Sequence, residues 1–201
     1  HLNFEAFYTL SRQVLLDKQI AELYDSGNEV KNSIAAILAD QQLPLEGSNV
    51  ATVSIAEIST YMQNVLLRDT DQMSMANALE VRVPFLDYTL VEYVLNLPDK
   101  FKEIITPKKL LIDAMGDLLP PEVVNRPKMG FVLPWEQWMK NELKTFCEQK
   151  LKKLGKRKGF KEGGILKLWK LFLENNSKVS WSRIWILVVL ENWLETNGID
   201  E

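Results

Sequence analysis

Residues 179–194, VSWSRIWILVVLENWL, form a predicted helix that carries apolar side chains on nearly every face. A helix of this kind must lie at the centre of a hydrophobic core or be covered by another part of the protein. Its apolar run falls well short of the roughly 20 residues that a membrane span requires. The stretch therefore predicts a helical, soluble protein that packs around this segment.

Helical periodicity also dominates the rest of the chain, and strand patterns are limited to two short extended pieces, residues 80–85 and 130–133. Prolines at positions 84, 120 and 121 mark breaks between helices. The expected helices span residues 4–16, 23–40, 54–64, 65–80, 88–96, 107–118, 134–153, 163–175 and 179–195. We therefore expect an all-α, irregular multi-helix fold, with residues 1–201 forming a single helical domain.

Composition excludes several function classes. The net charge of −3 argues against a dedicated nucleic-acid binder, and the opening residues do not resemble a signal peptide. One cysteine, Cys147, rules out an internal disulfide and fits a reducing compartment. With a single histidine as well, metal sites built from soft ligands are out of reach. We expect a cytoplasmic protein that binds no metal through its own residues, no nucleic acid and no membrane.

A basic stretch, residues 150–161, holds seven lysines and arginines around Gly155 and Gly159. It could be a phosphate or nucleic-acid patch. It could also be a solvated helix end followed by a linker, since cations are favoured near a helix C-terminus. Aromatic residues are scarce here, which disfavours nucleic acid. We expect residues 150–162 to form a mobile basic loop.

Residues 61–87, YMQNVLLRDTDQMSMANALEVRVPFLD, contain carboxylates at positions that helical spacing would place among apolar side chains. Asp69 and Glu80 fall on such a stripe, and Asp71 lies off it. Buried carboxylates need partners, and Arg68 and Arg82 are the nearest in sequence. Two readings stay open, an internal ion-pair network that fixes the 83–85 turn, or a set of groups that lines a pocket.

Residues 106–114, TPKKLLIDA, resemble the start of a helix, with Thr106 as N-cap and Pro107 in the first helical position. Lys109 can pair with Asp113 one turn later. Lys108 has no such local partner. A lysine beside the free N–H groups of a helix start suits a phosphate or pyrophosphate, although it could also extend into solvent.

Residues 118–138 contain a stiff basic turn formed by Arg126, Pro127, Lys128 and Gly130. Aromatic residues follow this turn, and we expect them to pack the connection onto the helices. The chain contains no phosphate-binding loop of the GxxxxGK[ST], GxGxxG or Ser-Gly-Gly-x-Asp-Ser type, and no GxSxG.

Read in order, these three segments resemble the synthetase domain of glutamine-hydrolysing asparagine synthetases. The matching residues are Asp71, Ser74-Met75-Ala76 and Leu79-Glu80-Val81-Arg82-Val83-Pro84-Phe85-Leu86-Asp87, then Lys108, Leu110, Leu111, Leu119 and Pro120, then Arg126 to Phe131, Pro134 and Trp138. The resemblance covers about residues 60–140.

The resemblance implies the helical C-terminal portion of an adenine-nucleotide α-hydrolase-like synthetase domain, without its α/β part. In that family a separate glutaminase domain supplies ammonia, and ATP with Mg²⁺ converts aspartate to β-aspartyl-AMP before ammonia displaces AMP. Lys108 resembles the catalytic lysine that meets pyrophosphate or the acyl-adenylate. The other residues carried over would support the substrate pocket: Asp71, Glu80, Arg82, Asp87, Arg126 and Lys128. The piece alone would hold no cofactor and be inactive, and its partners would be the missing glutaminase and pyrophosphate-loop parts and small-molecule substrates.

Two positions depart from the family pattern, because Ile112 often corresponds to arginine and Asp69 to lysine. Both changes remove positive charge, so the acceptor could be a carboxylate other than aspartate. Two further alternatives stay open: a helical scaffold module that has lost catalysis, and a ring-closing ligase like the β-lactam synthetases. Apolar surface left uncovered would also favour self-association into a homo-oligomer.

Overall fold

The computed structural model of the chain describes residues 3–25, 27, 32–41, 49–102, 108–127, 129–130 and 133–199. These residues form helices joined by turns, and within them no strand occurs, only an isolated bridge between Tyr24 and Phe160. The predicted all-α class is therefore confirmed. No helix in the described ranges is both long and apolar enough to cross a membrane.

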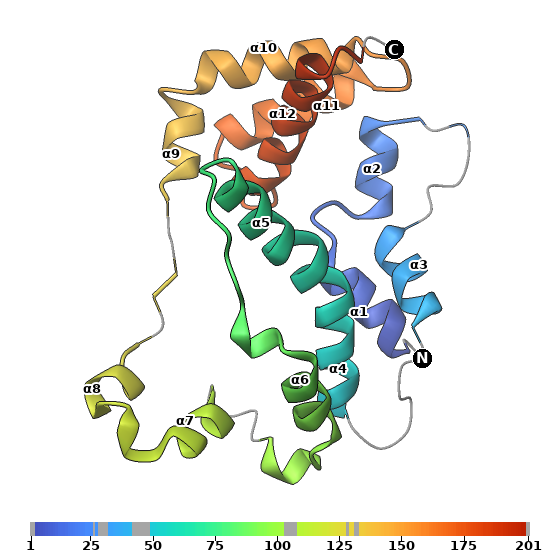
Figure 1. Ribbon diagram of the computed structural model, residues 1–201. Helices are drawn as coiled ribbons and strands as arrows, with labels where there is room; N and C mark the ends of the chain where they lie inside the picture. Colours follow the sequence, from blue (N-terminus) through green and yellow to red (C-terminus); the bar gives the residue numbers. More distant parts are fainter. Residues whose placement is uncertain are drawn as a thin grey trace. The chain divides into compact units, whose positions relative to one another are not determined.

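The chain divides into two compact units, where we expected one domain over residues 1–201. The terminal unit joins the two ends of the sequence, His1–Lys31 and Gly130–Glu201, and the central unit is Asn32–Met129. Figure 1 shows the helices of both units with their labels. The two units are described separately below.

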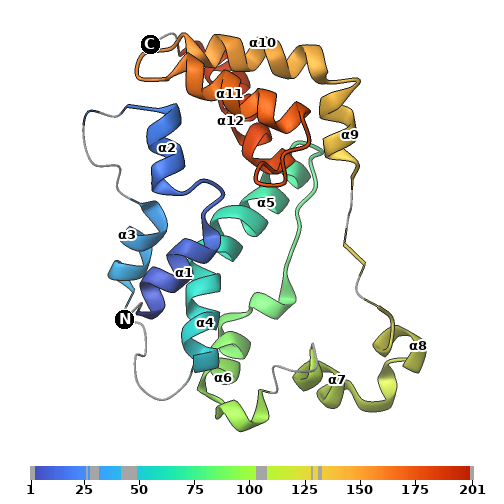
Figure 2. The ribbon, with the colours of Figure 1, turned by 180° about the vertical axis from the view of Figure 1, so that it is seen from behind.

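Six helices make up the terminal unit within its described residues. They are α1 (Phe4–Arg12), α2 (Asp17–Leu23), α9 (Trp135–Lys140), α10 (Lys144–Gly155), α11 (Glu162–Leu173) and α12 (Trp181–Thr196). Its core lies where α10, α11 and α12 meet, helices that group together in Figure 2 as well. The fully buried members of this core include Met139, Leu151, Leu154, Ile165 and Phe172.

The apolar C-terminal helix has one buried and one open face. Ile184 and Val188 are fully buried in the core of the terminal unit. Val189 and Trp193, on another side of α12, keep 46% and 55% of their surface exposed. The prediction of a central core helix is thus confirmed for one face only.

Aromatic side chains join the start of α9 to α12. The ring centroid of Trp135 lies 4.6 Å from that of Trp185 and 5.9 Å from that of Trp181. Such pairs add to the stability that burial of their area provides. The expectation that aromatics after the Pro-Gly turn pack onto helices is confirmed at Trp135.

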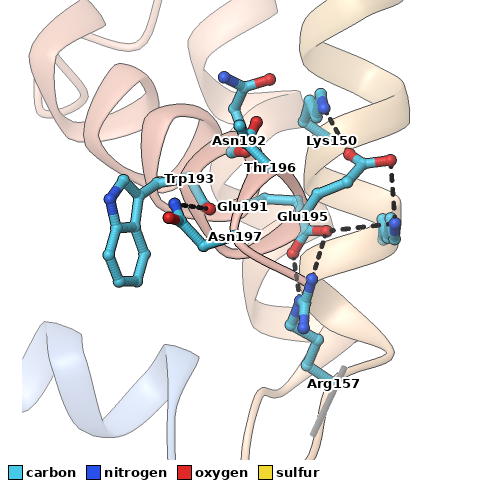
Figure 3. A network of polar contacts seen from close by, with 9 residues as sticks. Lys150, Arg157, Glu191, Asn192, Trp193, Glu195, Thr196 and Asn197 are labelled. Carbon is cyan, nitrogen blue, oxygen red and sulfur yellow. Dashed lines mark hydrogen bonds and ion pairs between the residues drawn. The ribbon is translucent and has the colours of Figure 1, made fainter. Parts of the chain in front are cut away.

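The basic stretch differs from the expected loop, because residues 150–155 form the last turns of α10. Ion pairs attach this helix to α12. Lys150 Nζ lies 2.5 Å from a carboxylate oxygen of Glu195, and Lys153 Nζ lies 3.0 Å from the other. Figure 3 shows Lys150 of α10 facing the Glu195 carboxylate of α12.

Beneath these pairs lies a buried one. Glu191, with no exposed surface, accepts from Arg157 Nε at 2.5 Å and from Nη2 at 3.0 Å (Figure 3). Arg157 Nη1 donates to the carbonyl of Ile199, beyond the end of α12. The Ile199 N–H in turn donates to the Leu194 carbonyl at 2.9 Å, which closes the helix end. One guanidinium therefore links α12, the turn after α10 and the C-terminal residues.

The helix α2 packs directly on α11. A Cβ built on Gly164 would lie 2.1 Å from the carbonyl oxygen of Glu22, so only glycine fits this crossing. The Lys161 N–H donates to the Leu23 carbonyl at 2.8 Å, and Lys161 Nζ donates to the Ala21 carbonyl at 2.8 Å. The start of the chain is thereby fastened to a segment about 140 residues later.

The described part of the central unit contains α3 (Ser33–Asp40), α4 (Asn49–Glu57), the π-helix η1 (Ile58–Leu67), α5 (Arg68–Met75), α6 (Tyr88–Asn96), α7 (Lys109–Met115) and α8 (Pro121–Val124). Short 3-10 turns follow at η2 (Pro84–Leu86), η3 (Asp99–Phe101) and η4 (Gly116–Leu118). Residues 49–75 run as one continuous helix through η1, where we expected two helices.

The wide π-helical turn is stabilised by side chains that bond to the backbone. The Ser59 and Thr60 hydroxyls donate to the carbonyls of Ile55 and Ala56, and Asn64 Nδ2 donates to the carbonyls of both Ser59 and Thr60 at 3.0 Å. A π-turn leaves carbonyls poorly aligned with their usual donors, so these bonds compensate for them.

The helix α5 ends at Met75, five residues before the predicted end. Ala78 adopts a left-handed conformation with φ +55°, and the Leu79 N–H donates to the Ser74 carbonyl at 2.9 Å. This is the Schellman pattern that stops a helix, here with alanine in the place that glycine usually takes. Glu80 consequently lies outside the helix.

Candidate functional site

The central unit contains a large apolar pocket. Its volume is about 820 Å³, and α4, η1, η2, α6 and α7 all contribute to its wall. Most of the lining is aliphatic or aromatic, and it includes Val53, Met62, Phe85, Leu90, Val94 and Leu111. The charged and polar side chains in the wall include those of Ser54, Glu57, Tyr93, Lys102, Lys108 and Lys109. Apolar walls with a few convergent polar groups are typical of small-molecule sites.

Two of the three lysines in this wall are engaged by the protein itself. Lys109 Nζ lies 2.8 Å from both carboxylate oxygens of Asp113, which confirms the predicted local pair. Lys102 Nζ donates to the Leu95 carbonyl at 2.8 Å. For Lys108, no polar partner occurs among the residues that the structure describes. Its ammonium group is therefore the cation of the pocket wall that remains available to an anion.

Lys108 also has an unusual backbone. It stands just before α7 with φ +63° and ψ +17°, in the left-handed region that residues other than glycine rarely adopt. Such a conformation costs free energy and tends to persist at functional sites. The helix begins at Lys109, and the expected cap residues Thr106 and Pro107 lie outside the described residues.

Asp87 shapes the pocket indirectly, as the N-cap of α6. Its carboxylate accepts from the N–H groups of Thr89 and Leu90 and from the Thr89 hydroxyl. The hydroxyl bond, then the two N–H bonds, lower the pKa of Asp87 below its ordinary value of 3.8. Because Leu90 and Val94 of α6 line the pocket, this cap fixes the beginning of one wall.

Glu80 and Arg82 form an ion pair of 2.8 Å on the surface, not within the pocket wall. Their side chains keep 74% and 85% of their surface exposed. This pair lies in the segment between α5 and η2, for which a buried ion-pair network was one of the two interpretations of the sequence. The exposed setting shows that the segment is not fixed by buried charges.

The remaining predicted residues lie apart from the pocket wall. Asp71 is exposed in the first turn of α5, and Arg126 is exposed after α8. Lys128 lies outside the described residues. Of the predicted site residues, the described part of the chain brings only Lys108 to the pocket.

The apolar residues that line the pocket of the central unit were not predicted from the sequence. Val50, Val53, Ser54, Glu57 and Ile58 repeat at three and four residue intervals, which is the signature of one helix face. That periodicity could have identified the face, although not what it would enclose. No group of three or more carboxylate, histidine or cysteine side chains that could hold a metal ion occurs within the described ranges. We assign no Mg²⁺ ligand to them.

Part of the chain is similar in sequence to curated proteins. It is 39% identical over 97 residues to asparagine synthetase [glutamine-hydrolyzing] 1 of Bacillus subtilis, an alignment that covers 48% of this chain and 15% of that protein. It is 45% identical over 72 residues to asparagine synthetase [glutamine-hydrolyzing] 3 of the same organism, with 35% and 12% covered. The amidase chry2 of Gibberella zeae is 31% identical over 97 residues, with 44% and 14% covered.

The chain thus spans only a small part of the length of the curated relatives it matches. No solved structure matches it. The family model for asparagine synthase matches residues 4–195, which include both units. On this match over nearly the whole sequence, the chain belongs to the asparagine synthase family.

Proposed function

We propose that this chain is the C-terminal part of a cytoplasmic, glutamine-dependent ligase that amidates a carboxylate at the expense of ATP. In this reaction the carboxylate of the acceptor, aspartate, attacks the α-phosphorus of ATP and releases pyrophosphate. Ammonia from glutamine then attacks the acyl carbon of the adenylate, and AMP leaves. Membership of the family and the names of the glutamine-hydrolysing relatives support this proposal.

The observation that carries the proposal is Lys108. Its ammonium lines the pocket without a partner in the described part of the chain, and its backbone is held in a left-handed conformation. A lysine is a compact point charge that suits phosphate oxygens. Placed beside the pyrophosphate or the acyl-adenylate, it would stabilise the negative charge that develops as the leaving group departs.

The other predicted residues would support the site without touching the reacting atoms. Asp87 would hold the start of α6 and so the pocket wall. Asp71, Glu80 and Arg82 would orient the segments on either side of Ala78. Arg126 and Lys128 would add positive charge for an anionic substrate.

The 201-residue chain by itself should bind ATP weakly and catalyse nothing, because the phosphate-binding loop of the family is not in its sequence. ATP and Mg²⁺ would be bound by the longer protein. Isothermal titration calorimetry of the chain with ATP tests this, and a micromolar dissociation constant would contradict it.

The decisive experiment measures pyrophosphate release by the longer protein with ATP, glutamine and aspartate. Lys108→Ala should lower kcat by about 10²–10³-fold, the loss typical when one charge-stabilising group is removed from an active site. Lys109→Ala is the matched control. Because Lys109 is already paired with Asp113, its removal should change the rate little. Equal effects of the two substitutions would refute the role of Lys108.

A second candidate changes the acceptor and not the chemistry. The pocket beside Lys108 is mostly apolar, whereas aspartate is polar throughout. Asp69 and Ile112 also replace cations that the family often carries. A carboxylic acid with an apolar body would fit this wall better. Pyrophosphate release with a panel of carboxylic acids, but not with aspartate, would establish this alternative, and silence across the panel would favour a scaffold without catalysis.

A further inference from the structure

The terminal unit contains a small cavity bounded by α2, α11 and the beginning of α12. Its volume is about 170 Å³, the space of about six water molecules at roughly 30 Å³ each. One part of its lining is aliphatic and consists of Leu15, Leu23, Leu168, Leu171 and Val179. The other part is polar, and its described residues include three cations, Lys167, Lys178 and Arg183, and one carboxylate, Glu22. The lining therefore combines an apolar surface with a net positive charge.

Two amide side chains in the polar part are used at one end only. Gln19 Oε1 accepts from the Leu16 N–H at 2.9 Å, and Asn176 Oδ1 accepts from the Lys178 N–H at 3.0 Å. Because a backbone N–H can only donate, these bonds fix which end of each amide is the oxygen. The two NH₂ groups have no hydrogen-bond partner among the residues that the structure describes. The protein thus uses the acceptor of each amide and leaves the donors free.

The cations of the lining also leave donors free. Arg183 donates through Nε to the Val14 carbonyl at 3.1 Å and through Nη1 to the Lys178 carbonyl at 2.5 Å. Its Nη2 group has no partner in the described ranges, and neither has the ammonium group of Lys167 or Lys178. Free donors from five side chains therefore line the same cavity, a composition that suits a negatively charged ligand rich in acceptor oxygens.

Contacts within the terminal unit hold the walls of this cavity in place. The close crossing at Gly164 fixes α2 against α11. At the end of α11, Asn175 adopts φ +57° and the Asn176 N–H donates to the Leu171 carbonyl at 3.0 Å, which is a Schellman turn. Arg183 ties the connection before α2 to the turn before α12. Walls that are fixed before a ligand arrives reduce the cost of ordering them on binding.

We propose that this cavity binds a small aliphatic carboxylate, with the carboxylate among the free donors and the hydrocarbon body against the leucines. At the volume of the cavity, the ligand has on the order of six to eight non-hydrogen atoms. Inorganic phosphate would meet the donors but would leave the aliphatic lining uncovered, so the carboxylate fits better. The cavity belongs to a different unit from the Lys108 pocket, and the inference does not depend on the proposed function.

Isovalerate is the probe, because it joins a carboxylate to a branched aliphatic body of this size. Saturation-transfer difference NMR on the longer protein should show binding with a dissociation constant on the order of millimolar, as expected for so small a ligand. Isovaleramide lacks the charge and acetate lacks the body, so each should bind at least about tenfold more weakly. Isovaleramide or acetate that binds as well as isovalerate would overturn the proposal.

The longer protein is the required sample, because its other segments surround the chain. The 201-residue chain should bind isovalerate with a similar dissociation constant. Binding to this chain and not to the longer protein would show that another segment fills the cavity, and it would overturn the proposal. Absence of binding to both proteins would overturn it as well.

Substitution of the two amides places the ligand in this cavity. Gln19→Glu and Asn176→Asp each keep the oxygen that accepts from the backbone and replace the free NH₂ group by a second carboxylate oxygen. Each should weaken isovalerate binding by about tenfold or more, because a like charge then faces the ligand. Glu22→Gln removes a carboxylate from the lining and should tighten binding by about threefold. Misfolding cannot produce such a gain.

Two control variants complete the test. Gln149→Glu makes the same change of charge at an exposed position of α10 outside the cavity lining, and should leave isovalerate binding unchanged. Lys108→Ala should also leave it unchanged, because Lys108 lines the pocket of the central unit. Equal effects of Gln19→Glu and Gln149→Glu, or loss of binding in Lys108→Ala, would refute this site.

Discussion

Removing either partner of the buried Arg157–Glu191 pair should destabilise the terminal unit strongly. Glu191 has no exposed surface and Arg157 has 8%, so the partner that remains would be left buried without its counter-charge. Breaking such a pair typically costs about 3–5 kcal/mol. For a chain of this size that corresponds to a fall in Tm of roughly 6–20 °C. We expect Glu191→Gln and Arg157→Met each to fall in this range.

The double variant Arg157→Met/Glu191→Met should lose far less than the sum, within about 2 kcal/mol of wild type, because it removes both desolvation penalties together. Urea unfolding followed by tryptophan fluorescence measures this for the terminal unit alone, since all six tryptophans lie within residues 130–201. Glu174→Gln is the matched control, in the exposed pair with Lys170, and should cost no more than about 1 kcal/mol. Additive losses in the double variant, or a loss below 1 kcal/mol in Glu191→Gln, would refute the reasoning.

Three further predictions concern single sites. Gly164→Ala should destabilise the terminal unit by about 1–3 kcal/mol, because the added Cβ would meet the Glu22 carbonyl. Gly163→Ala is the control: its Cβ meets nothing within 4 Å, so it should stabilise the unit by up to about 1 kcal/mol. Urea unfolding of the two variants measures both changes. Ala78→Gly should raise the unfolding free energy of the central unit by about 1 kcal/mol, since glycine adopts φ +55° without strain. Amide hydrogen exchange in α5 measures this change, and weaker protection of the α5 amides in the variant would contradict the prediction. The hydrogen bonds from Lys150 and Lys153 of α10 lower the pKa of Glu195 from 4.5 to about 2. The stability that the Glu195 carboxylate contributes is therefore complete above pH 4.5 and is lost as the pH falls toward 2. When Tm is measured against pH, the difference in Tm between wild type and Glu195→Gln should shrink to zero between pH 4.5 and 2.

The helical class and the strongest helices could be predicted from local signals. The predicted helix 88–96 matches α6 at both ends, because Asp87 is a strong N-cap and Pro98 follows shortly after the helix. The predicted helix 179–195 differs from α12 by one or two residues. In both cases the sequence pattern and the packing favour the same structure.

Boundaries set by tertiary contacts or unusual backbone could not be predicted. The helix α5 stops through a left-handed alanine, and Ala78 gives no warning of this in the sequence, as glycine would. The basic residues after Lys150 looked like a solvated loop because their partners, Glu191 and Glu195, lie about 40 residues away in sequence. Charge in one segment says little about a counter-charge from a distant helix.

For the site, the sequence identified one residue well and the walls poorly. The local pairing of Lys109 with Asp113 is confirmed, which leaves Lys108 as the distinct lysine. The pocket that Lys108 lines is formed by helices separated by up to about 60 residues, and periodicity within one helix cannot reveal which other helix faces it. The supporting roles of Asp71, Glu80, Arg82, Arg126 and Lys128 stay predictions.

The contact of α2 with α11 has a consequence for synthesis on the ribosome. The hydrogen bond from Lys161 to Ala21 joins residues 140 positions apart, with the whole central unit translated between them. At about 5–20 residues per second, α2 must wait roughly 7–28 s for the helix that covers it. During that interval Leu23, 5% exposed in the finished fold, is available to chaperones, whereas the central unit can already fold as an insertion. During co-translational folding, α2 should therefore be buried only after the central unit has been translated.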